Sequence, residues 1–397
     1  MNGPMNRREA FRNLALFFAG SPLVKAQQLD LPYTPERLPS IDELVNVFEF
    51  EPLCRYRIPK NAYDYIAGGV DAEWTLRRNR EAFDRITFRP RMLTGVSNVD
   101  LSIELWGRKA EMPIFIAPTA AHQLAHPEGE LATVRAAAEV RSVLVVSSAS
   151  SYPIEKISAA AGEPPWFQLY AEPDLDGARE RVGRAVGAGC KVIFFTVDGP
   201  FNSHRERLLR NRIAEQVPPG GARPQPQRRR RSEEPKEPSA PYRLQPRFTA
   251  QLDWKFLDTL SSWAKLPIVV KGILTAEDAR LAVQHGAAGI VVSNHGGRYL
   301  EFAPATIEVL PEIVDAVGGK IPVLIDSGFR RGTDVLKGLA LGAKAVLVGR
   351  PPLWGLGAYG QAGVKRVMEL LQAELALALA LAGRPNLQSI DPSLVRR

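Results

Sequence analysis

The feature that most constrains this chain is a repeat of eight short apolar runs between residues 113 and 348, most of them separated by alanine-rich segments with helical spacing. The runs are almost continuously apolar and rich in Val and Ile, as expected for strands buried on both faces of a parallel sheet. The clearest helical patterns cover residues 131–140, 278–284 and 333–341. Eight strand-then-helix units predict an α/β fold, a (β/α)8 TIM barrel. The predicted strands are residues 113–117, 143–147, 166–169, 192–197, 268–271, 290–293, 323–326 and 345–348.

The remainder of the chain divides around this repeat. Residues 111–390 are expected to form the barrel, and residues 27–110 an N-terminal helical and irregular segment that covers one end of it. In residues 1–26, Arg7 and Arg8 precede a short apolar stretch and then small residues, which is the order of an export signal. The paired arginines resemble a twin-arginine signal, which implies folding in the cytoplasm and export to the periplasm. The alternative is a disordered or surface-lying arm.

One strand-to-helix connection is much longer than the others. About 70 residues separate the fourth and fifth predicted strands, far more than such loops usually contain. Residues 213–246 within it are rich in Pro, Arg, Gln and Glu, cannot bury apolar surface, and are predicted to be a flexible, disordered insert. Because the connection follows a strand, it belongs to the functional face of a barrel. A mobile lid and an inert insertion both fit this position.

Composition narrows the class of protein. The chain has 397 residues, of which 45% are hydrophobic and 24% charged, as in soluble globular proteins. The net charge of +8 suggests nucleic acid, but the basic run at 228–231 adjoins three glutamates, and no aromatic residue interleaves with it. A solvated loop is therefore favoured, with no nucleic-acid partner. The two cysteines form no disulfide framework or metal-ligand spacing, and no apolar run reaches the ~18 residues of a membrane span.

The loops after the last two predicted strands combine glycines with Arg330 and Arg350. Backbone N–H groups freed by glycine, together with a guanidinium, suit a phosphate group, and this is the usual phosphate position of such barrels. A charged rim is the alternative. No G-x-G-x-x-G sequence follows a strand, so a dinucleotide-binding fold is not indicated.

The sixth predicted strand is followed by N-H-G-G-R, which presents His295 and Arg298 on a backbone made nearly free of side chains by Gly296 and Gly297. Glycine lets a ligand approach closely. Arginine can clamp a carboxylate with two hydrogen bonds, and histidine accepts a proton near neutral pH. The pair predicts proton transfer next to a carboxylate.

Motifs spread over about residues 40–390 closely resemble the FMN-dependent 2-hydroxy acid oxidase/dehydrogenase family, which includes glycolate oxidase, lactate oxidase and mandelate dehydrogenase. The resemblance implies FMN as cofactor, oxidation of a small (S)-2-hydroxy acid to the 2-keto acid, O2 or another electron acceptor, and a homotetramer. The segments that carry the resemblance are Y-D-Y-I-A-G-G, F-R-P-R, A-P-T-A, A-H-P-E-G-E, F-Q-L-Y, T-V-D-G-P, N-H-G-G-R, R-R-G-T-D-V and G-R-P.

The resemblance also implies roles for individual residues. His295 would accept a proton, with Asp198 stabilising its charged form, and Lys271 would stabilise the reduced flavin. Substrate contacts would come from Tyr65, Tyr170, Arg205 and Arg298, with Tyr170 also in the catalytic set. Cofactor contacts would come from Thr119, Ser147, Gln168, Thr196, Lys271, Ser293, Asp326, Gly328, Arg330, Gly349 and Arg350.

Four positions depart from the family pattern. Ser203 and Leu208 replace a glycine and an aspartate near Arg205, and Ser327 replaces a glycine in the turn after the seventh strand. Ala149 stands where glycolate oxidase has tryptophan, which favours a lactate-like or longer substrate over glycolate. Two alternatives remain at this point: a flavin-barrel isomerase of the type-2 isopentenyl diphosphate isomerase kind, and a degenerate FMN-binding protein. The sequence does not separate an oxidase from a dehydrogenase.

Overall fold

The computed structural model describes residues 38–171, 174–216 and 252–397. The predicted export signal at 1–26 lies outside the described residues, as does all of the predicted insert beyond residue 216.

Contacts divide the chain into two compact units, Met1–Val45 and Asn46–Arg397. The described part of the first unit holds one short 3-10 helix, η1 (Ile41–Glu43), in which the Ser40 N–H donates to the Glu43 carboxylate. Everything that follows concerns the second unit.

An eight-stranded parallel sheet forms the centre of the second unit, with the strand order β4-β11-β10-β9-β8-β7-β6-β5. The two ends of this order meet through a parallel bridge between Ile116 and Leu144, where the Ile116 N–H donates to the Val143 carbonyl, so the sheet closes into a barrel. The prediction of a (β/α)8 barrel is confirmed. The strands are β4 (Ile114–Ile116), β5 (Val145–Ser147), β6 (Trp166–Leu169), β7 (Ile193–Thr196), β8 (Ile268–Ile273), β9 (Gly289–Val292), β10 (Val323–Ile325) and β11 (Ala345–Val348).

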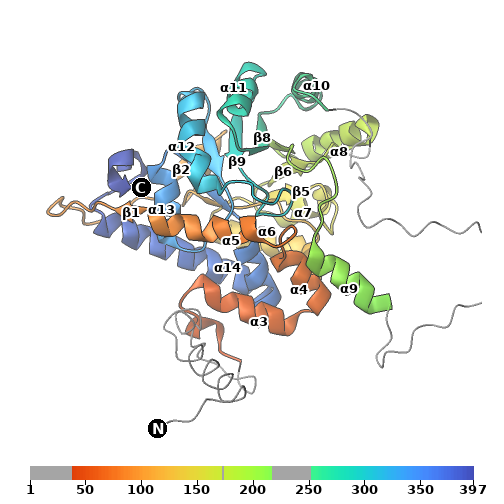
Figure 1. Ribbon diagram of the computed structural model, residues 1–397, viewed down its shortest axis with the longest axis horizontal. Helices are drawn as coiled ribbons and strands as arrows, with labels where there is room; N and C mark the ends of the chain where they lie inside the picture. Colours follow the sequence, from red (N-terminus) through yellow and green to blue (C-terminus); the bar gives the residue numbers. More distant parts are fainter. Residues whose placement is uncertain (1–37, 172–173, 217–251) are drawn as a thin grey trace, which may run out of the picture. The chain divides into compact units, whose positions relative to one another are not determined.

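Helices follow the strands and pack around the sheet (Figure 1). Local sequence explains several starts: the Asp174 carboxylate caps α8 and the Thr275 hydroxyl caps α11, each accepting a backbone N–H of the first turn. The last helix bends where Gly360 has φ 61°. The helices are α6 (Gly129–Glu139), α7 (Ile154–Ala160), α8 (Leu175–Gly187), α9 (Glu206–Gln216), α10 (Lys255–Ala264), α11 (Ala276–Gln284), α12 (Thr306–Val317), α13 (Gly332–Ala340) and α14 (Arg350–Leu381).

The amino end of the barrel is plugged by a hairpin of β2 (Ile103–Leu105) and β3 (Arg108–Ala110). Trp106 in its turn lies edge-on to Trp166, with ring centroids 5.2 Å apart, and its Nε1 donates to the Ala288 carbonyl. A Cβ at Gly289, the first residue of β9, would lie 2.7 Å from the Trp106 ring, so glycine there leaves room for the plug. An apolar layer that includes Phe115, Trp166, Phe194 and Leu347 fills the barrel above it.

The segment before the hairpin reaches the other end of the barrel. Its helices are α3 (Phe50–Arg57), α4 (Lys60–Ala67) and α5 (Trp74–Glu81); α3 packs on α14, and α4 packs on α9 (Figure 1). The Val70 N–H donates to the Gly297 carbonyl, and the amides of Asn79 and Asn294 bond to each other. The N-terminal segment therefore contacts both ends of the barrel, because its hairpin enters one and its helices border the other.

The remaining elements are short. Strand β1 (Thr87–Phe88) pairs antiparallel with β12 (Val395–Arg396) near the C-terminus. Four further 3-10 helices are η2 (Val47–Glu49), η3 (Ala82–Arg85), η5 (Leu387–Ser389) and η6 (Pro392–Leu394), and a fifth, η4 (His122–Leu124), follows β4.

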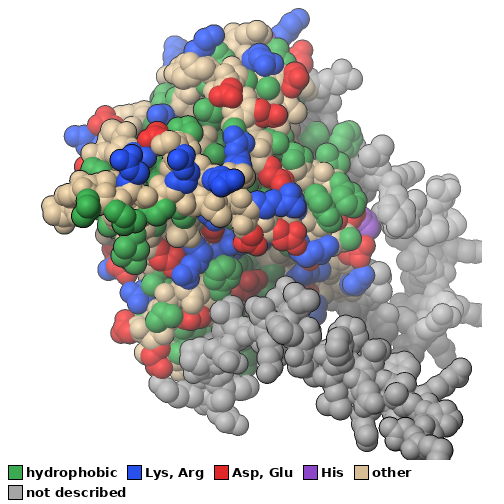
Figure 2. Space-filling view, turned by 60° about the vertical axis from the view of Figure 1, so that its left-hand side comes forward, with side chains coloured by type: hydrophobic (Ala, Val, Ile, Leu, Met, Phe, Trp, Pro, Cys, Tyr) green, Lys and Arg blue, Asp and Glu red, His purple; other side chains and the backbone are tan. Residues whose placement is uncertain are grey.

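The surface in Figure 2 intersperses basic and acidic side chains instead of collecting one sign in a single patch. Among the described helices, none is long and apolar enough to cross a membrane. Cys54 and Cys190 are buried free thiols. No three His, Cys, Asp or Glu side chains within the described ranges are grouped to hold a metal ion.

Candidate active site

A cavity of about 260 Å³ opens at the carboxyl ends of the barrel strands, where a barrel places its functional residues. Its walls come from the ends of most strands, from the connection after β7 and from α4 of the N-terminal segment. Most of the residues predicted for the site lie in its wall: Tyr65, Thr119, Ser147, Tyr170, Arg205, Lys271, His295, Arg298, Asp326, Gly328, Arg330, Gly349 and Arg350. The other predicted residues, Gln168, Thr196, Asp198 and Ser293, are not in the wall, and all but Asp198 are buried.

His295 has different neighbours at its two ring nitrogens. Its Nδ1 lies 2.7 Å from Asp198 Oδ1, and its Nε2 lies 3.2 Å from the Tyr170 hydroxyl, which borders the cavity. A carboxylate next to Nδ1 holds the proton on that nitrogen. The lone pair of Nε2 is therefore directed toward Tyr170 and the cavity.

The electrostatics of this pair favour a neutral imidazole next to an ionised carboxylate. Burial lowers the pKa of His295, and Asp198 only partly opposes this. Burial alone would raise the pKa of Asp198, but the interaction with His295, which includes a hydrogen bond, and the charge of Lys271 hold it below its usual value. His295 can therefore accept a proton at Nε2, and Asp198 can stabilise the resulting cation.

Lys271 is a buried cation at the carboxyl end of β8. Its Nζ lies 3.1 Å from Asp326 Oδ2 and donates to Ser293 Oγ at 2.8 Å. The same Ser293 Oγ accepts the His295 N–H at 3.1 Å. Burial alone would lower the pKa of Lys271, but Asp326 and Asp198 raise it above its ordinary value. The ammonium therefore stays charged beside the cavity.

Two guanidinium groups meet at the Tyr65 ring. The Arg205 Cζ lies 5.3 Å and the Arg298 Cζ 5.1 Å from the ring centroid, and Arg298 Nη1 donates to the Tyr65 carbonyl at 2.8 Å. Both cations border the same cavity, so an anion bound beside them would offset the repulsion between their charges. This is the part of the cavity that suits a substrate carboxylate.

Two further arginines, Arg330 and Arg350, line the same cavity and follow β10 and β11 in the chain. Arg350 donates to the carbonyls of Ile66, Gly68 and Gly296, and Arg330 stacks over Trp354 with its Cζ 4.6 Å from the ring. Burial lowers the pKa of Arg330 to about 10 and that of Arg350 to about 9, with further lowering by neighbouring arginines.

A guanidinium remains protonated in proteins. The lowered pKa values therefore indicate a free-energy cost of holding these two charges away from water, which an anion bound beside them would offset. Arg350 is also the first residue of the long helix α14, where backbone N–H groups favour an anion. The two arginines and the helix start therefore fit a phosphate group.

Two polar atoms are buried near the carboxyl ends of the neighbouring strands β6 and β7. In the part of the chain that the structure describes, Thr196 Oγ1 and Gln168 Nε2 are buried without a hydrogen-bond partner. Gln168 Oε1 does accept from Ser147 Oγ at 2.9 Å, whereas the Thr119 hydroxyl is bonded to His122 Nε2 at 2.6 Å. Buried polar atoms are normally paired. A hydroxyl and an amide left open at neighbouring strand ends fit a flat heteroaromatic ring with its own donors and acceptors, such as the isoalloxazine of FMN.

Several lining residues had no role predicted from the sequence, and two of them, Tyr299 and Ser327, follow predicted site residues directly in the chain. Tyr299 lines the cavity edge-on to His295, with ring centroids 4.6 Å apart, and a Cβ at Gly199 would lie 2.6 Å from its ring. Ser327 also lines the cavity and stood out only as a departure from a glycine. The one signal for Tyr299 was its place next to Arg298 in the loop.

A closed barrel with a proton acceptor, a fixed ammonium and a pair of arginines suited to a phosphate in one cavity is compatible with a flavin-dependent oxidoreductase. Comparison with known proteins gives the family: residues 54–397 match the model for FMN-dependent dehydrogenase. The chain belongs to this family, whose cofactor is FMN, and it is an oxidoreductase.

Curated relatives cover nearly the whole chain. Glycolate oxidase of Spinacia oleracea is 44% identical over 363 residues, which is 88% of this chain and 95% of that protein. Peroxisomal (S)-2-hydroxyacid oxidase of Arabidopsis thaliana is 45% identical over 358 residues, 90% of this chain and 97% of that protein. A crystal structure of mandelate oxidase with 3,3-difluoro-2-hydroxy-3-phenylpropionic acid is 41% identical, with a TM-score of 0.77, covering 89% of this chain and 98% of that one.

Proposed function

We propose that this protein oxidises an (S)-2-hydroxy acid to the corresponding 2-keto acid. The observation that carries the proposal is the arrangement around Tyr65 and His295: two guanidiniums for a carboxylate lie in the same cavity as an imidazole whose Nε2 can accept a proton. The similar glycolate, (S)-2-hydroxyacid and mandelate oxidases support the same substrate class.

The substrate-facing side chains have distinct tasks. Arg205 and Arg298 bind the carboxylate together with Tyr65, and the Tyr170 hydroxyl holds the oxygen on C2. His295 Nε2 removes the hydroxyl proton, and Asp198 stabilises the imidazolium that forms. Bound FMN supplies the other half of the oxidation by accepting the C2 hydrogen with two electrons, which balances loss of the hydroxyl proton and leaves a carbonyl at C2.

The cofactor is held by two groups of residues. Thr119, Ser147, Gln168, Thr196 and Ser293 would hold the ring system and ribityl chain, and the Lys271 ammonium would stabilise the negative charge that the ring gains on reduction. The ribityl and phosphate are held by Asp326, Gly328, Arg330, Gly349 and Arg350.

Ala149 sets how much room the substrate has. It lines the cavity next to the end of β5, and its N–H donates to Ser147 Oγ at 3.1 Å. A methyl group there leaves space beyond C2, which favours a lactate-like or longer acid over glycolate.

The proposal is tested by mixing the oxidised yellow holoprotein anaerobically with glycolate, lactate, mandelate and 2-hydroxyoctanoate. At least one acid should bleach the flavin absorbance and appear as its 2-keto acid. An isopentenyl diphosphate isomerase would leave the oxidised flavin unbleached by every hydroxy acid, and so would a degenerate FMN-binding protein. Either outcome would refute the proposal.

The same experiment addresses the electron acceptor. Admission of air should restore the yellow colour within seconds if O2 is the acceptor, and much more slowly if another acceptor is used.

The resemblance to the family also leads us to propose a homotetramer, which light scattering of the holoprotein would test. Export through a twin-arginine signal is a separate proposal, and fractionation of cells expressing the full chain would test it.

A further inference from the structure

Ser327 adopts a backbone conformation that serine rarely takes. It follows Asp326 after β10, lines the cavity, and has φ 77°, in the left-handed region that favours glycine. The next residue, Gly328, has φ 90°, and a Cβ there would lie 2.1 Å from the Asn79 carbonyl oxygen. The shape of the turn is thus already fixed by Gly328, and the side chain at 327 is not needed to form it.

The hydroxyl of Ser327 makes two hydrogen bonds that join separate loops. Its Oγ donates to Asp326 Oδ1 at 2.7 Å and accepts the Gly296 N–H at 3.0 Å. Asp326 is thereby held at both oxygens, because its Oδ2 lies 3.1 Å from Lys271 Nζ. Gly296 follows His295 directly, so one hydroxyl contacts both the lysine–aspartate pair and the loop that carries the histidine.

This position determines how strongly Asp326 neutralises Lys271. While Ser327 donates to Oδ1, part of the carboxylate charge is engaged away from the ammonium. Without that donor, the carboxylate would interact more strongly with Lys271, whose positive charge would then be less available to a reduced, negatively charged ring.

We propose that Ser327 is a positioning residue that raises the reduction potential of bound FMN by holding the Asp326 carboxylate against the loop of His295. The proposal rests on the placement of Lys271 beside the flavin given under the proposed function. It concerns a residue whose hydroxyl bonds to Asp326 and Gly296 and would act through them.

Two substitutions distinguish the effect of the Ser327 hydroxyl from the effect of the backbone conformation at this position. Ser327→Ala and Ser327→Gly both remove the hydroxyl, but only glycine also relieves the positive φ. If the hydroxyl is responsible, both variants should have a reduction potential about 30 mV below that of the unmodified protein. This shift corresponds to a tenfold change in the equilibrium constant of a two-electron couple. Their melting temperatures should differ, with the glycine variant the higher of the two.

The potential is measured without substrate, by anaerobic reduction of the holoprotein against a reference dye. Lys265→Gly is the matched control: Lys265 is exposed, has φ 50°, and ends helix α10 away from the cavity. That variant should gain thermal stability and keep the potential of the unmodified protein.

Each outcome is decisive. Potentials of both Ser327 variants within a few millivolts of the unmodified protein would overturn the proposal, and so would a lowered potential in Ser327→Ala alone, which would indicate backbone strain instead of the hydroxyl. Failure of the proposed function would appear elsewhere, as unmodified holoprotein that no 2-hydroxy acid bleaches.

Discussion

The imidazole of His295 is useful because its surroundings fix which nitrogen carries the proton. Asp198 occupies Nδ1, and the Tyr170 hydroxyl and the cavity face Nε2. We predict that His295→Ala retains FMN but reduces the rate of flavin reduction by about 10²–10⁴-fold, the usual contribution of a general base. Stopped-flow absorbance with the best substrate measures this. A loss of less than tenfold, with FMN fully bound, would show that another group accepts the proton.

The pH dependence follows from the same residue. Burial lowers the pKa of His295 below its ordinary value of about 6.5, so the neutral, proton-accepting form predominates above that pH. The value of kcat/KM should be constant there and fall as the pH drops through the lowered pKa. Asp198→Asn removes the negative charge that opposes this lowering, so the acidic limb of its pH profile should move to still lower pH. Its rate should fall by about 10²–10⁴-fold, because the neutral amide no longer stabilises the imidazolium and its N–H can donate to Nδ1, which favours the wrong tautomer. An acidic limb above pH 7 in the unmodified protein would contradict this assignment.

Substrate size should depend on Ala149. Each additional buried methylene contributes about 0.8 kcal/mol, roughly a fourfold preference per carbon. Lactate and longer acids should therefore have a higher kcat/KM than glycolate, and Ala149→Trp should reverse the order. Glycolate, lactate and 2-hydroxyoctanoate are compared in both proteins, with Ala149→Ser as a control that keeps the volume small. An unchanged ranking in the tryptophan variant would mean that another residue selects chain length.

At the scale of the elements, strand β8 contains an irregularity that places two of the proposed functional residues. Its pairing with β9 shifts between Lys271 and Ile273, and Gly272 between them has φ 116°. A Cβ at Gly272 would lie 2.6 Å from the Asp198 Cβ and 3.0 Å from the Asp198 backbone nitrogen. Only glycine therefore combines this backbone conformation with so close an approach of the loop that carries Asp198.

We predict that Gly272→Ala displaces Asp198, destabilises the protein by about 1–3 kcal/mol and slows turnover at least tenfold. Gly319→Ala is a matched control, because Gly319 also has a positive φ, 74°, but a Cβ there meets nothing within 4 Å. The control should lose stability through backbone strain alone and keep its kcat. Denaturant unfolding and steady-state rates measure both effects. Equal rates in the two variants would show that the close contact with Asp198 is unimportant.

The irregular pairing of β8 also shows why some features could not be predicted from the sequence. The strands were recognisable because burial on both faces requires nearly continuous apolar runs, and Lys271 and Asp326 followed from the polar residues at their ends. Register shifts leave no such pattern, so the extension of β8 to Ile273 was not foreseen. Tyr65 was reached only through family resemblance, since its helix α4 precedes the barrel and no local pattern connects it to Arg298.

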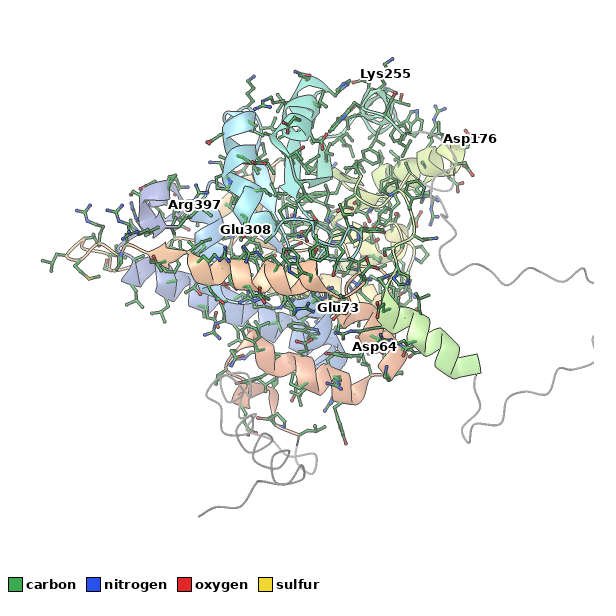
Figure 3. The ribbon with its side chains drawn as sticks, in the orientation of Figure 1. Asp64, Glu73, Asp176, Lys255, Glu308 and Arg397 are labelled. Carbon is green, nitrogen blue, oxygen red and sulfur yellow. The ribbon has the colours of Figure 1, made fainter. Side chains whose placement is uncertain are left out.

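Polar side chains of α9 contact elements that are remote in the sequence. Arg207 pairs with Glu73 at 2.6 Å, and Asn211 donates to the Asp64 carboxylate at 2.9 Å. Helix α9 is therefore attached to α4, which contains Asp64, and to the start of α5 at Glu73; both acidic residues are labelled in Figure 3. Arg205, which lies beside Tyr65, precedes this helix directly. These contacts link the position of Arg205 to helices that come much earlier in the chain, which no local sequence pattern could reveal.

At the scale of the whole molecule, the proposed phosphate pocket connects parts of the chain that are far apart in sequence. Arg350 at the start of α14 bonds to carbonyls of the N-terminal segment and of the loop after β9. No carboxylate within the described residues forms an ion pair with Arg330 or Arg350, although burial lowers the pKa of both. A buried cation, Arg330, and a partly buried one, Arg350, oppose folding of the apoprotein when no anion is bound beside them.

We therefore predict that FMN stabilises the protein mainly through its phosphate. A ligand that binds only the folded state adds about 4 kcal/mol to the free energy of unfolding when present at 1,000 times its Kd. The melting temperature of apoprotein should rise strongly with FMN and much less with riboflavin, which has the same ring system but no phosphate. Arg330→Met should raise the melting temperature of the apoprotein, by removing a buried charge, and shrink the difference between FMN and riboflavin. Equal stabilisation by the two flavins in the unmodified protein would show that the ring contacts, and not the arginine pocket, provide the stabilisation.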